Sequence, residues 1–414
     1  MDNAYIITIG DELLNGNTLD SNSTWLSKKL SFFGIKVIEK ISIPDDINII
    51  ENCINNVLEK NCEFLFITGG LGPTHDDITK AAIKNVTNSK LEFDQDYYTE
   101  LKLKFKDKGI KFLENNKSQA MVLSNCVKIE NPIGSALGIN FDMKGSKVFV
   151  FPGVPKEMQV MFEKKILPKY FNDNNKIVNN VTLLTAGLHE SYIYNEIEKL
   201  ILNFSNYVKV AFLPKYTGVN IRLSLLNNNI NTEKMFDLEN KIRTKLGNKI
   251  YGSDNETLEE KLGELLIENN LNIAIAESCT GGLLSKLITD VPGSSRYYYG
   301  STIAYKNDIK IKHLNVAEES INKFGAVSSE VVEEMAIGVR EKFKSDIGFS
   351  ISGISGPEGG SKEKPVGLVC MALSTNEKTI SKRFNFLPDR KMHRQISSNV
   401  AMNMIRIYIL KNYD

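Results

Sequence analysis

The feature of this sequence that most constrains its fold is a short apolar run that ends in glycines and passes directly into a helical pattern. The segment EFLFITGG ends this way at residues 69–70, and NIAIAESCTGG does so at residues 281–282. Short apolar runs are typical of strands that are buried on both faces, as in parallel sheets. Because such strands alternate with helical patterns along the chain, the sequence predicts β–α–β units with right-handed crossovers.

The chain divides into three predicted regions. Its 414 residues suit two or three domains, since a domain usually has about 100–200 residues. Residues 1–170 and 255–414 each alternate strand and helix patterns, so we expect two doubly wound α/β domains. Residues 171–252 carry helical patterns near 190–203 and 233–246, which predicts a small α+β domain that joins them. We expect this middle region to be a spacer or the interface of a homodimer.

The composition restricts the class of protein. Lys and Arg total 51 and Asp and Glu total 50, for a net charge of +1. Proteins dedicated to nucleic acids usually carry a strong basic excess, so we expect no direct nucleic-acid binding. The five cysteines include no CxxC pair, which argues against disulfides and against a zinc ribbon. The sequence shows no basic leader and no long apolar stretch, so we expect a cytoplasmic protein without a membrane partner.

The segment TGGLGPTHDDITK, residues 68–80, follows the third predicted strand. Its glycines let a ligand approach the backbone, and N–H groups ahead of a helix suit a phosphate. Asp76 and Asp77 stand where the helix begins, so they could cap it or bind a ligand. The segment lacks the GxxxxGK[ST] and GxGxxG patterns, which argues against a P-loop and against dinucleotide redox chemistry.

Acidic residues occur in several loops that follow predicted strands of the first region. In an open α/β sheet, ligands bind beyond the carboxyl ends of the strands, so these side chains should converge. Carboxylate oxygens hold hard divalent cations, and a cation placed between carboxylates and phosphates is a common means of cleaving a phosphoanhydride. The sequence therefore predicts a metal site formed by Glu12, Asp45, Asp76 and Asp77.

Five motifs of the first region resemble, in order, the molybdopterin-binding-like domain of the CinA family over residues 1–170: GDELLNG, SIPDD, TGGLGPTHDDIT, NPIGSALGI and FPGVPKEM. The resemblance implies ADP-ribose pyrophosphatase activity with a divalent Mg, Mn or Co ion, and potassium is a further candidate cation. Related molybdopterin-binding proteins place key aspartates in the loops that match Asp45 and Asp77. Those proteins act on a pterin dithiolene, so the fold alone does not fix the substrate. The implied nucleotide site comprises Thr68, Gly69, Gly70, Gly72, Asp45, Asp77, Ser135 and Gly153.

The turn AESCTGG joins a strand to a helix in the third region. Ser278 could act there as a nucleophile, with the following N–H groups as an oxyanion hole, or it could only cap the helix. Cys279 is the alternative nucleophile, because a free thiol with a pKa of about 8.5 is partly ionised at neutral pH. Ser278 needs a base, and none of the four histidines stands in a recognisable triad pattern.

A lysine is the alternative base. Its pKa would have to fall from about 10.4 toward 7, a change worth roughly 4–5 kcal/mol that burial beside another cation could supply. Tyr305 ends an apolar strand, and Lys310 follows five residues later. A Ser–Tyr–Lys relay is one interpretation of this spacing, and an exposed lysine on a helix is the other. The loop at residues 352–367 is rich in Gly and Ser, and its free N–H groups suit a phosphate.

Five motifs of the third region are similar to the C-terminal nicotinamide-nucleotide amidohydrolase domain of the same family, over about 255–414: AESCTGG, VPGSSRYYYGSTIAYKNDIK, GAVSSEVVEEMAIG, ISGISGPEGGSKEKPVG and DRKMHRQ. The resemblance implies Ser278 as the nucleophile and Tyr305 with Lys310 as the proton-handling pair. Family members often have two glycines where this chain has Gly300 and Ser301, a departure that we expect the pocket to tolerate. The expected substrate contacts are Cys279, Thr280, Gly281, Gly353, Gly356, Gly359, Gly360 and Arg390, with Arg394 as a second candidate for the phosphate.

The predicted function is therefore that of a bifunctional enzyme of pyridine-nucleotide recycling. One substrate is nicotinamide mononucleotide, which the third region converts to nicotinic acid mononucleotide and ammonia without a cofactor. The other is ADP-ribose, which the first region hydrolyses. Two other classes stay open: a binding scaffold associated with competence or DNA damage, and a molybdopterin-handling protein that acts through residues 1–170.

Overall fold

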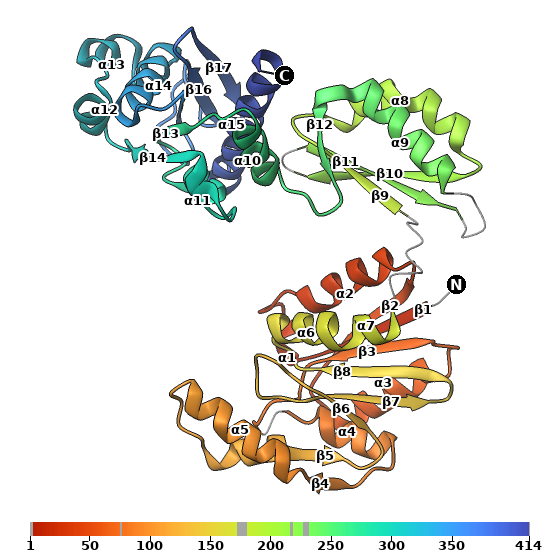
Figure 1. The fold of residues 1–414 in the computed structure, drawn as a ribbon. Helices are drawn as coiled ribbons and strands as arrows, with labels where there is room; N and C mark the ends of the chain where they lie inside the picture. The colour runs from red at the N-terminus through yellow and green to blue at the C-terminus, as the bar shows by residue number, and fades with distance from the viewer. Residues whose placement is uncertain (1–2, 75–76, 172–179, 216–217, 227–231, 414) are drawn as a thin grey trace. The chain divides into compact units, whose positions relative to one another are not determined.

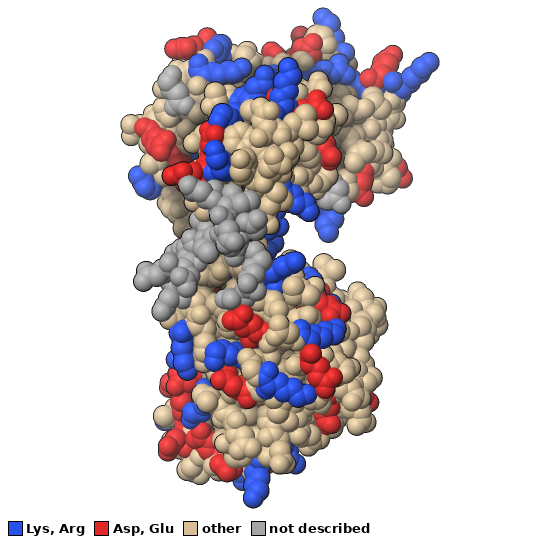
Figure 2. Space-filling model, turned by 90° about the vertical axis from the view of Figure 1, so that its right-hand side faces the viewer, with Lys and Arg blue, Asp and Glu red and all other residues tan. Residues whose placement is uncertain are grey.

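A computed structural model describes residues 3–74, 77–171, 180–215, 218–226 and 232–413. The contacts divide the chain into two compact units, Met1–Asn180 and Val181–Asp414, and Figure 1 shows the elements of each. No helix within the described ranges combines the length and the apolar character needed to cross a membrane. Acidic and basic side chains are interspersed on the face of each unit that Figure 2 shows, without a broad area of one sign among the described residues.

The first unit contains a six-stranded sheet whose strand order is β2-β1-β3-β8-β7-β6. The first four strands in this order run parallel, and β7 and β6 are antiparallel additions at one edge. The strands are β1 (Asn3–Ile9), β2 (Lys36–Ile43), β3 (Phe64–Thr68), β6 (Val127–Ile129), β7 (Gly138–Met143) and β8 (Ser146–Phe151). The carboxyl ends of the parallel strands therefore meet at one edge, where the loops of the predicted site lie.

Helices cover both faces of this sheet, because successive side chains of a strand point to opposite faces. In β1, Ile7 and Ile9 pack into one core with α3 (Ile47–Leu58) and α4 (Thr79–Val86). Ala4 and Ile6 pack into a second core on the other face, with α2 (Ser21–Phe32) and α6 (Pro155–Met161). The remaining elements are α1 (Asp11–Leu14), β4 (Leu91–Phe93), α5 (Gln95–Asp107), β5 (Met121–Leu123) and α7 (Leu167–Tyr170).

The second unit begins with a four-stranded sheet of order β10-β11-β9-β12, with α8 and α9 on one face (Figure 1). Its strands are β9 (Asn180–Thr185), β10 (Val208–Lys215), β11 (Gly218–Leu225) and β12 (Ile250–Ser253), and its helices are α8 (Glu190–Phe204) and α9 (Glu233–Leu246). Strands paired as neighbours with helices on one face form the α+β arrangement that the sequence predicts for this region.

The remainder of the second unit is built on a five-stranded sheet of order β14-β13-β15-β16-β17. Strands β13 (Ile273–Glu277), β14 (Tyr298–Ile303) and β15 (Ile347–Gly353) run parallel, whereas β16 (Leu368–Ser374) and β17 (Thr379–Asn385) are antiparallel. The predicted α/β class is confirmed for both large sheets. Each sheet also has antiparallel strands at one edge, which the sequence analysis does not distinguish, because apolar runs carry no information about strand direction.

The two faces of this sheet carry different side chains. Ile273 and Ile275 of β13 face α10 (Leu258–Glu268), α11 (Leu283–Thr289) and α15 (Arg390–Asn412). Ala274 and Ala276 face the other way, toward α12 (Asn307–Leu314), α13 (Glu318–Phe324) and α14 (Ser329–Phe343). The small alanine side chains let this second layer lie close to the sheet.

Helix α12 approaches α14 at a position that has no side chain. A Cβ atom added at Gly338 of α14 would lie 1.8 Å from the carbonyl oxygen of Leu314, the last residue of α12. The obstacle is backbone, so it cannot move aside as a flexible side chain would. Gly338 therefore sets the distance between the two helices.

We predict that Gly338→Ala destabilises the protein. Alanine favours a helix by about 1 kcal/mol over glycine, but overpacking against fixed backbone typically costs about 1–3 kcal/mol or more, so the second effect prevails. The measurement is the midpoint of urea unfolding, with Lys342→Ala at an exposed position of the same helix as the control. An unchanged midpoint in Gly338→Ala would contradict the close approach.

Candidate functional site

Ser278 lies directly after β13, which pairs with β14 on one side and β15 on the other. Its backbone N–H donates to the carbonyl oxygen of Ile351 at 2.9 Å, and the N–H of Ala304 donates to the carbonyl oxygen of Glu277 at 2.7 Å. The turn is thus fixed to both neighbouring strands. Ser278 is 8% exposed, so its hydroxyl lies in a largely dry position.

The amine of Lys310 reaches this hydroxyl from α12. Its Nζ lies 3.2 Å from Ser278 Oγ and 2.8 Å from the carbonyl oxygen of Ala304, and the residue is 1% exposed. Neither hydrogen-bond partner is a carboxylate, and burial lowers the pKa of Lys310 from its usual value. Of the two interpretations of Lys310 from the sequence, the structure excludes an exposed lysine.

Cys279 is the other candidate nucleophile of this turn. Burial raises the pKa of its thiol to about 12, so the thiolate that a nucleophile requires is disfavoured at neutral pH. A Cβ atom at Gly353 would lie 3.1 Å from the sulfur, which shows that the thiol fills the space beside β15. The geometry therefore favours Ser278 over Cys279 as the attacking group.

The carboxylate of Glu277 organises the turn, although the sequence analysis does not single it out. This buried side chain accepts hydrogen bonds from the backbone N–H groups of Gly282 at 2.8 Å, Leu284 at 3.2 Å and Ser285 at 2.8 Å. It also accepts from the Ser285 hydroxyl at 2.5 Å. An acid that ends a strand shortly before a helix begins is the signal that could have identified it.

The expectation that Gly281 contributes to an oxyanion hole needs correction. Its N–H donates to the carbonyl oxygen of Ser278 at 3.1 Å, so this donor already has a partner within the turn. The N–H groups of Cys279 and Thr280 make no main-chain or side-chain hydrogen bond to another residue in the part of the chain that the structure describes. These two amides are the available donors beside Ser278.

Tyr305 does not join Ser278 and Lys310 in a relay. Strand β14 ends at Ile303, and Tyr305 is 56% exposed in the segment beyond it. Its hydroxyl accepts a hydrogen bond from Arg390 Nη2 at 2.7 Å, and no hydrogen bond among the described residues links it to Ser278 or Lys310. The predicted proton-handling pair is therefore not assembled in this structure, because Tyr305 lies past the strand end.

The glycine-rich loop after β15 lies beside the N-terminal end of α15. Gly356 and Gly359 have φ values of 74° and 88°, in the left-handed region that glycine adopts readily, and a Cβ atom at Gly360 would lie 2.8 Å from the backbone N of Val366. Arg390 Nη1 donates to the carbonyl oxygen of Gly356 at 2.9 Å. Arg394 instead donates to the carbonyl oxygen of Thr280, from Nε at 3.1 Å and from Nη2 at 2.6 Å.

His393 is a second residue that the sequence analysis does not identify. It is fully buried, its Nδ1 lies 2.9 Å from Ser355 Oγ, and its Nε2 lies 3.2 Å from the carbonyl oxygen of Gly367. A carbonyl can only accept, so Nε2 carries the proton and Nδ1 accepts from the hydroxyl. Burial lowers the pKa of His393; the hydrogen bond to Gly367 partly offsets this shift, and the nearby charge of Arg390 adds a smaller lowering.

The acids of the first unit lie near one another. The pKa of Asp45 is raised, mainly by burial, and the negative charges of Asp11, Glu12 and Asp77 raise it further. Asp45 accepts a hydrogen bond from the backbone N–H of Asp11 at 3.1 Å. The Asp77 carboxylate accepts from the backbone N–H of Thr74 at 2.9 Å and from its hydroxyl.

The described residues contain no group of three or more His, Cys, Asp or Glu side chains placed to hold a metal ion. Asp76, one of the four predicted ligands, lies outside the described residues. The oxygen donors of Glu12, Asp45 and Asp77 have the chemistry that a hard cation prefers, and the charge repulsion at Asp45 is of the kind that a cation relieves.

Asn22 connects two loops of the predicted nucleotide site. Its Nδ2 donates to Thr68 Oγ1 at 2.8 Å and to the carbonyl oxygen of Gly153 at 2.8 Å, so the ends of β3 and β8 are fixed together. Gly69, Gly70 and Gly72 are in tight positions, because added Cβ atoms would lie 2.2 Å from Ile9 O, 2.2 Å from Thr79 Oγ1 and 2.5 Å from Asp77 Oδ2. The structure thus brings together the loops that carry Thr68, Gly69, Gly70, Gly72, Asp77 and Gly153.

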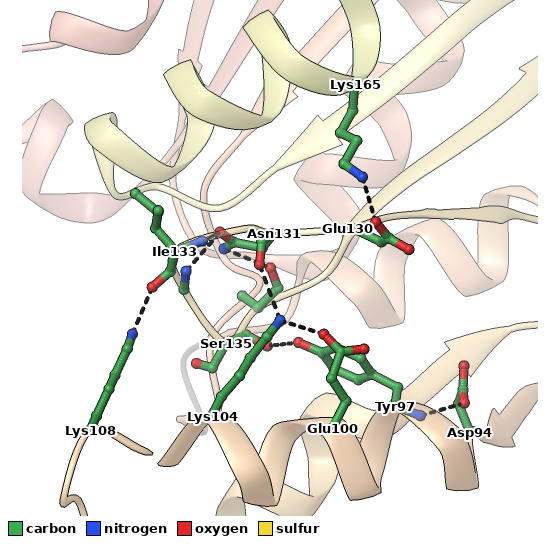
Figure 3. A network of polar contacts seen from close by, with 12 residues as sticks. Asp94, Tyr97, Glu100, Lys104, Lys108, Glu130, Asn131, Ile133, Ser135 and Lys165 are labelled. Atoms are coloured by element: carbon green, nitrogen blue, oxygen red, sulfur yellow. Dashed lines mark hydrogen bonds and ion pairs between the residues drawn. The ribbon is translucent and has the colours of Figure 1, made fainter. Parts of the chain in front are cut away.

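The loop that carries Ser135 is held by α5, as Figure 3 shows. Tyr97 donates its hydroxyl proton to the carbonyl oxygen of Ser135 at 2.6 Å. Lys104 and Lys108 donate to the carbonyl oxygens of Asn131 at 3.2 Å and Ile133 at 2.7 Å. Two side chains of α5 and that of Lys108, the residue directly after the helix, therefore fix the path of this loop.

Comparison with known proteins identifies the family. Three family profiles match the chain: a probable molybdopterin binding domain over residues 5–171, the damage-inducible protein CinA KH domain over 181–252, and the CinA C-terminal domain over 255–409. A CinA-like protein of Chloroherpeton thalassium is 36% identical over 97% of this chain and 98% of its own length. The chain belongs to the CinA family. A CinA-like protein of Thermotoga maritima is also 36% identical, over 99% of this chain and 98% of its own.

One solved structure of the family is the competence/damage inducible protein CihA from Agrobacterium tumefaciens. It is 32% identical, and the match covers 37% of this chain and 97% of that chain with a TM-score of 0.36. The names of these CinA relatives state no reaction and no substrate, so the chemistry must be argued from the site itself.

We predict that His393 makes stability depend on pH. Its folded-state pKa lies below the unfolded value of about 6.5, so between the two values the unfolded chain binds more protons. The contribution of His393 to stability is therefore constant above about pH 6.5 and falls as the pH drops below it, by up to about 1.4 kcal/mol per pH unit.

The measurement compares urea unfolding at pH 7.5 and pH 5.5 in the parent protein and in His393→Gln. The parent should lose more stability between the two pH values than the variant does. Equal losses in the two proteins would show that His393 is not the group responsible.

Proposed function

We propose that the C-terminal domain hydrolyses the carboxamide of nicotinamide mononucleotide to give nicotinic acid mononucleotide and ammonia. The observation that carries the proposal is the contact between Lys310 Nζ and Ser278 Oγ at 3.2 Å, in a dry position that lowers the pKa of the lysine. A neutral amine beside a hydroxyl is a base matched to a serine nucleophile. The choice of substrate rests on the family resemblance of the surrounding motifs.

In this reaction Lys310 accepts the hydroxyl proton while Ser278 Oγ bonds to the amide carbon. The C–N bond then breaks, and Lys310 returns the proton to the departing ammonia. Water hydrolyses the resulting acyl-serine ester, with Lys310 again as the base. The carbonyl of Ala304 holds the amine in position throughout, through its contact of 2.8 Å.

The negative oxygen of each tetrahedral intermediate needs donors. We assign the N–H groups of Cys279 and Thr280 to this role, because the Gly281 amide is already bonded within the turn. Loss of one such donor typically costs about 3–4 kcal/mol of transition-state stabilisation.

Arg390 and Tyr305 form an exposed pair beside the glycine-rich loop. We assign this pair, together with Gly353, Gly356, Gly359 and Gly360, to binding the ribose 5′-phosphate. Loop amides and a guanidinium are suitable donors for such an anion. The proton transfer is thus left to Lys310 alone.

We predict that Ser278→Ala and Lys310→Met each lower kcat for nicotinamide mononucleotide by at least about 10³-fold, since nucleophile and base act as a unit. In the parent protein kcat should rise with pH through the lowered pKa of Lys310, because the base acts in its neutral form. The measurement is ammonia release under saturating substrate.

Cys279→Ala separates the two candidate nucleophiles. It should retain activity within about tenfold of the parent, since only its backbone amide takes part. Activity that survives in Ser278→Ala and disappears in Cys279→Ala would assign the attack to the thiol. A parent protein without any ammonia release would remove the proposed substrate and favour the binding-scaffold alternative.

A second proposed activity is the hydrolysis of ADP-ribose by the N-terminal domain. The supporting observation is the crowding of Asp11, Glu12 and Asp77 around the partly buried Asp45. A divalent cation drawn to these carboxylates would offset this repulsion and bind the diphosphate. A molybdopterin ligand at the same loops is the alternative.

We predict that chelation by EDTA and the variant Asp77→Asn each abolish ADP-ribose hydrolysis, while Mg, Mn or Co restores it in the chelated parent. Asp142→Asn, at an exposed position that pairs with Lys147, is the control and should be fully active. Hydrolysis that is insensitive to EDTA and to Asp77→Asn would refute both the metal requirement and the assignment of Asp77.

A further inference from the structure

The first two turns of α15 contact three separate loops of the C-terminal site. Arg394 holds the nucleophile turn through Thr280, and Arg390 holds Tyr305 together with Gly356. His393 lies between these two arginines in the sequence and contacts Ser355 and Gly367. One rigid helix end therefore sets the relative positions of loops that come from three different strands.

His393 holds both ends of the glycine-rich loop. Ser355 opens the loop and Gly367 closes it, and the base of the loop is also joined by hydrogen bonds from Gly367 N to Ile354 O and from Ile354 N to Leu368 O, each of 2.8 Å. The carbonyl oxygen of Gly367 additionally accepts from the N–H of Phe386 at 2.9 Å. The imidazole is thus part of a closed set of polar contacts that determines where Gly356 lies.

The imidazole also has a packing role that can be separated from its polar one. Its ring lies 6.0 Å from the ring of Phe386 in an edge-to-face arrangement. A phenylalanine at position 393 would keep an aromatic ring of similar size but would lose both polar contacts. A glutamine would keep a donor and an acceptor but would lose the ring.

We propose that His393 is a positioning residue that fixes the glycine-rich loop for the 5′-phosphate of the substrate. The inference rests on the proposed amidase function, since that reaction supplies the phosphate-bearing ligand. His393 itself is fully buried and acts through Ser355 and Gly367. Because the hydrogen bonds of His393 run to Ser355 and Gly367 and not to Ser278 or Lys310, the effect should appear in substrate binding and not in the chemical step.

The test compares His393→Phe with His393→Gln in the full-length protein. We expect His393→Phe to raise KM for nicotinamide mononucleotide at least tenfold, with kcat changed less than threefold. In His393→Gln, KM should stay within threefold of the parent value. His189→Phe, an exposed histidine in the middle domain, is the matched control and should equal the parent. Thermal unfolding of each variant confirms that it is folded.

Hydrogen exchange of residues 354–367 in the same variants measures the loop independently of the reaction. Exchange should be faster in His393→Phe than in the parent and in His393→Gln. If the parent releases no ammonia, the proposed function fails, and the exchange data alone decide whether His393 orders the loop. Three results would each overturn the proposal. These are an unchanged KM in His393→Phe, the same fall in kcat and rise in KM in both variants, or unchanged hydrogen exchange.

Discussion

The buried contact between the Lys310 amine and the Ser278 hydroxyl is the constraint on which the C-terminal site depends. It requires β13 and β14 to pair in parallel register, with Glu277 opposite Ile303, so that Ser278 and Ala304 emerge side by side. It also requires α12 to lie close to the sheet, which the bare backbone at Gly338 permits. A dry pocket then lowers the pKa of the amine without a neighbouring carboxylate.

In both large sheets a candidate site lies at the carboxyl ends of the parallel strands, but the charged side chains beside the two sites differ in sign. At the strand ends of the first unit, acids gather around the partly buried Asp45, whose pKa is raised by burial and further by these charges. At the strand ends of the C-terminal domain, Arg390 and Arg394 supply cationic groups, and the buried side chain of Glu277 accepts hydrogen bonds from backbone N–H groups. Under the proposed functions, a diphosphate at the first site would need a metal cation, whereas a phosphate at the second would meet donors that belong to the chain.

Local patterns predict the elements well, and they predict single contacts poorly. Strands that end in glycine turns, and Ser278 at one of them, are visible because strand and turn preferences act over a few residues. Lys310 as a buried base was implied by family resemblance, since burial depends on packing against α14. Glu277, His393 and Asn22 were missed because a lone polar residue next to an apolar run looks like a cap or a surface residue. The predicted relay of Tyr305 with Ser278 and Lys310 was wrong, because the residue at which a strand ends, and therefore the exposure of Tyr305, cannot be read from the sequence.

The contact of α12 with Gly338 also divides the connection between α12 and α14 into two kinds of position. Residues 315–328, with α13 among them, form this connection, and the N–H of Val316 donates to the carbonyl oxygen of Lys310 at 3.3 Å. Val316 and Ile321 are buried in the core together with Leu314, so they help the approach of Leu314 to Gly338 to hold α12. Exposed side chains of the same connection, such as Glu319, have no such role, so substitution-tolerant positions alternate here with positions that hold Lys310 in place.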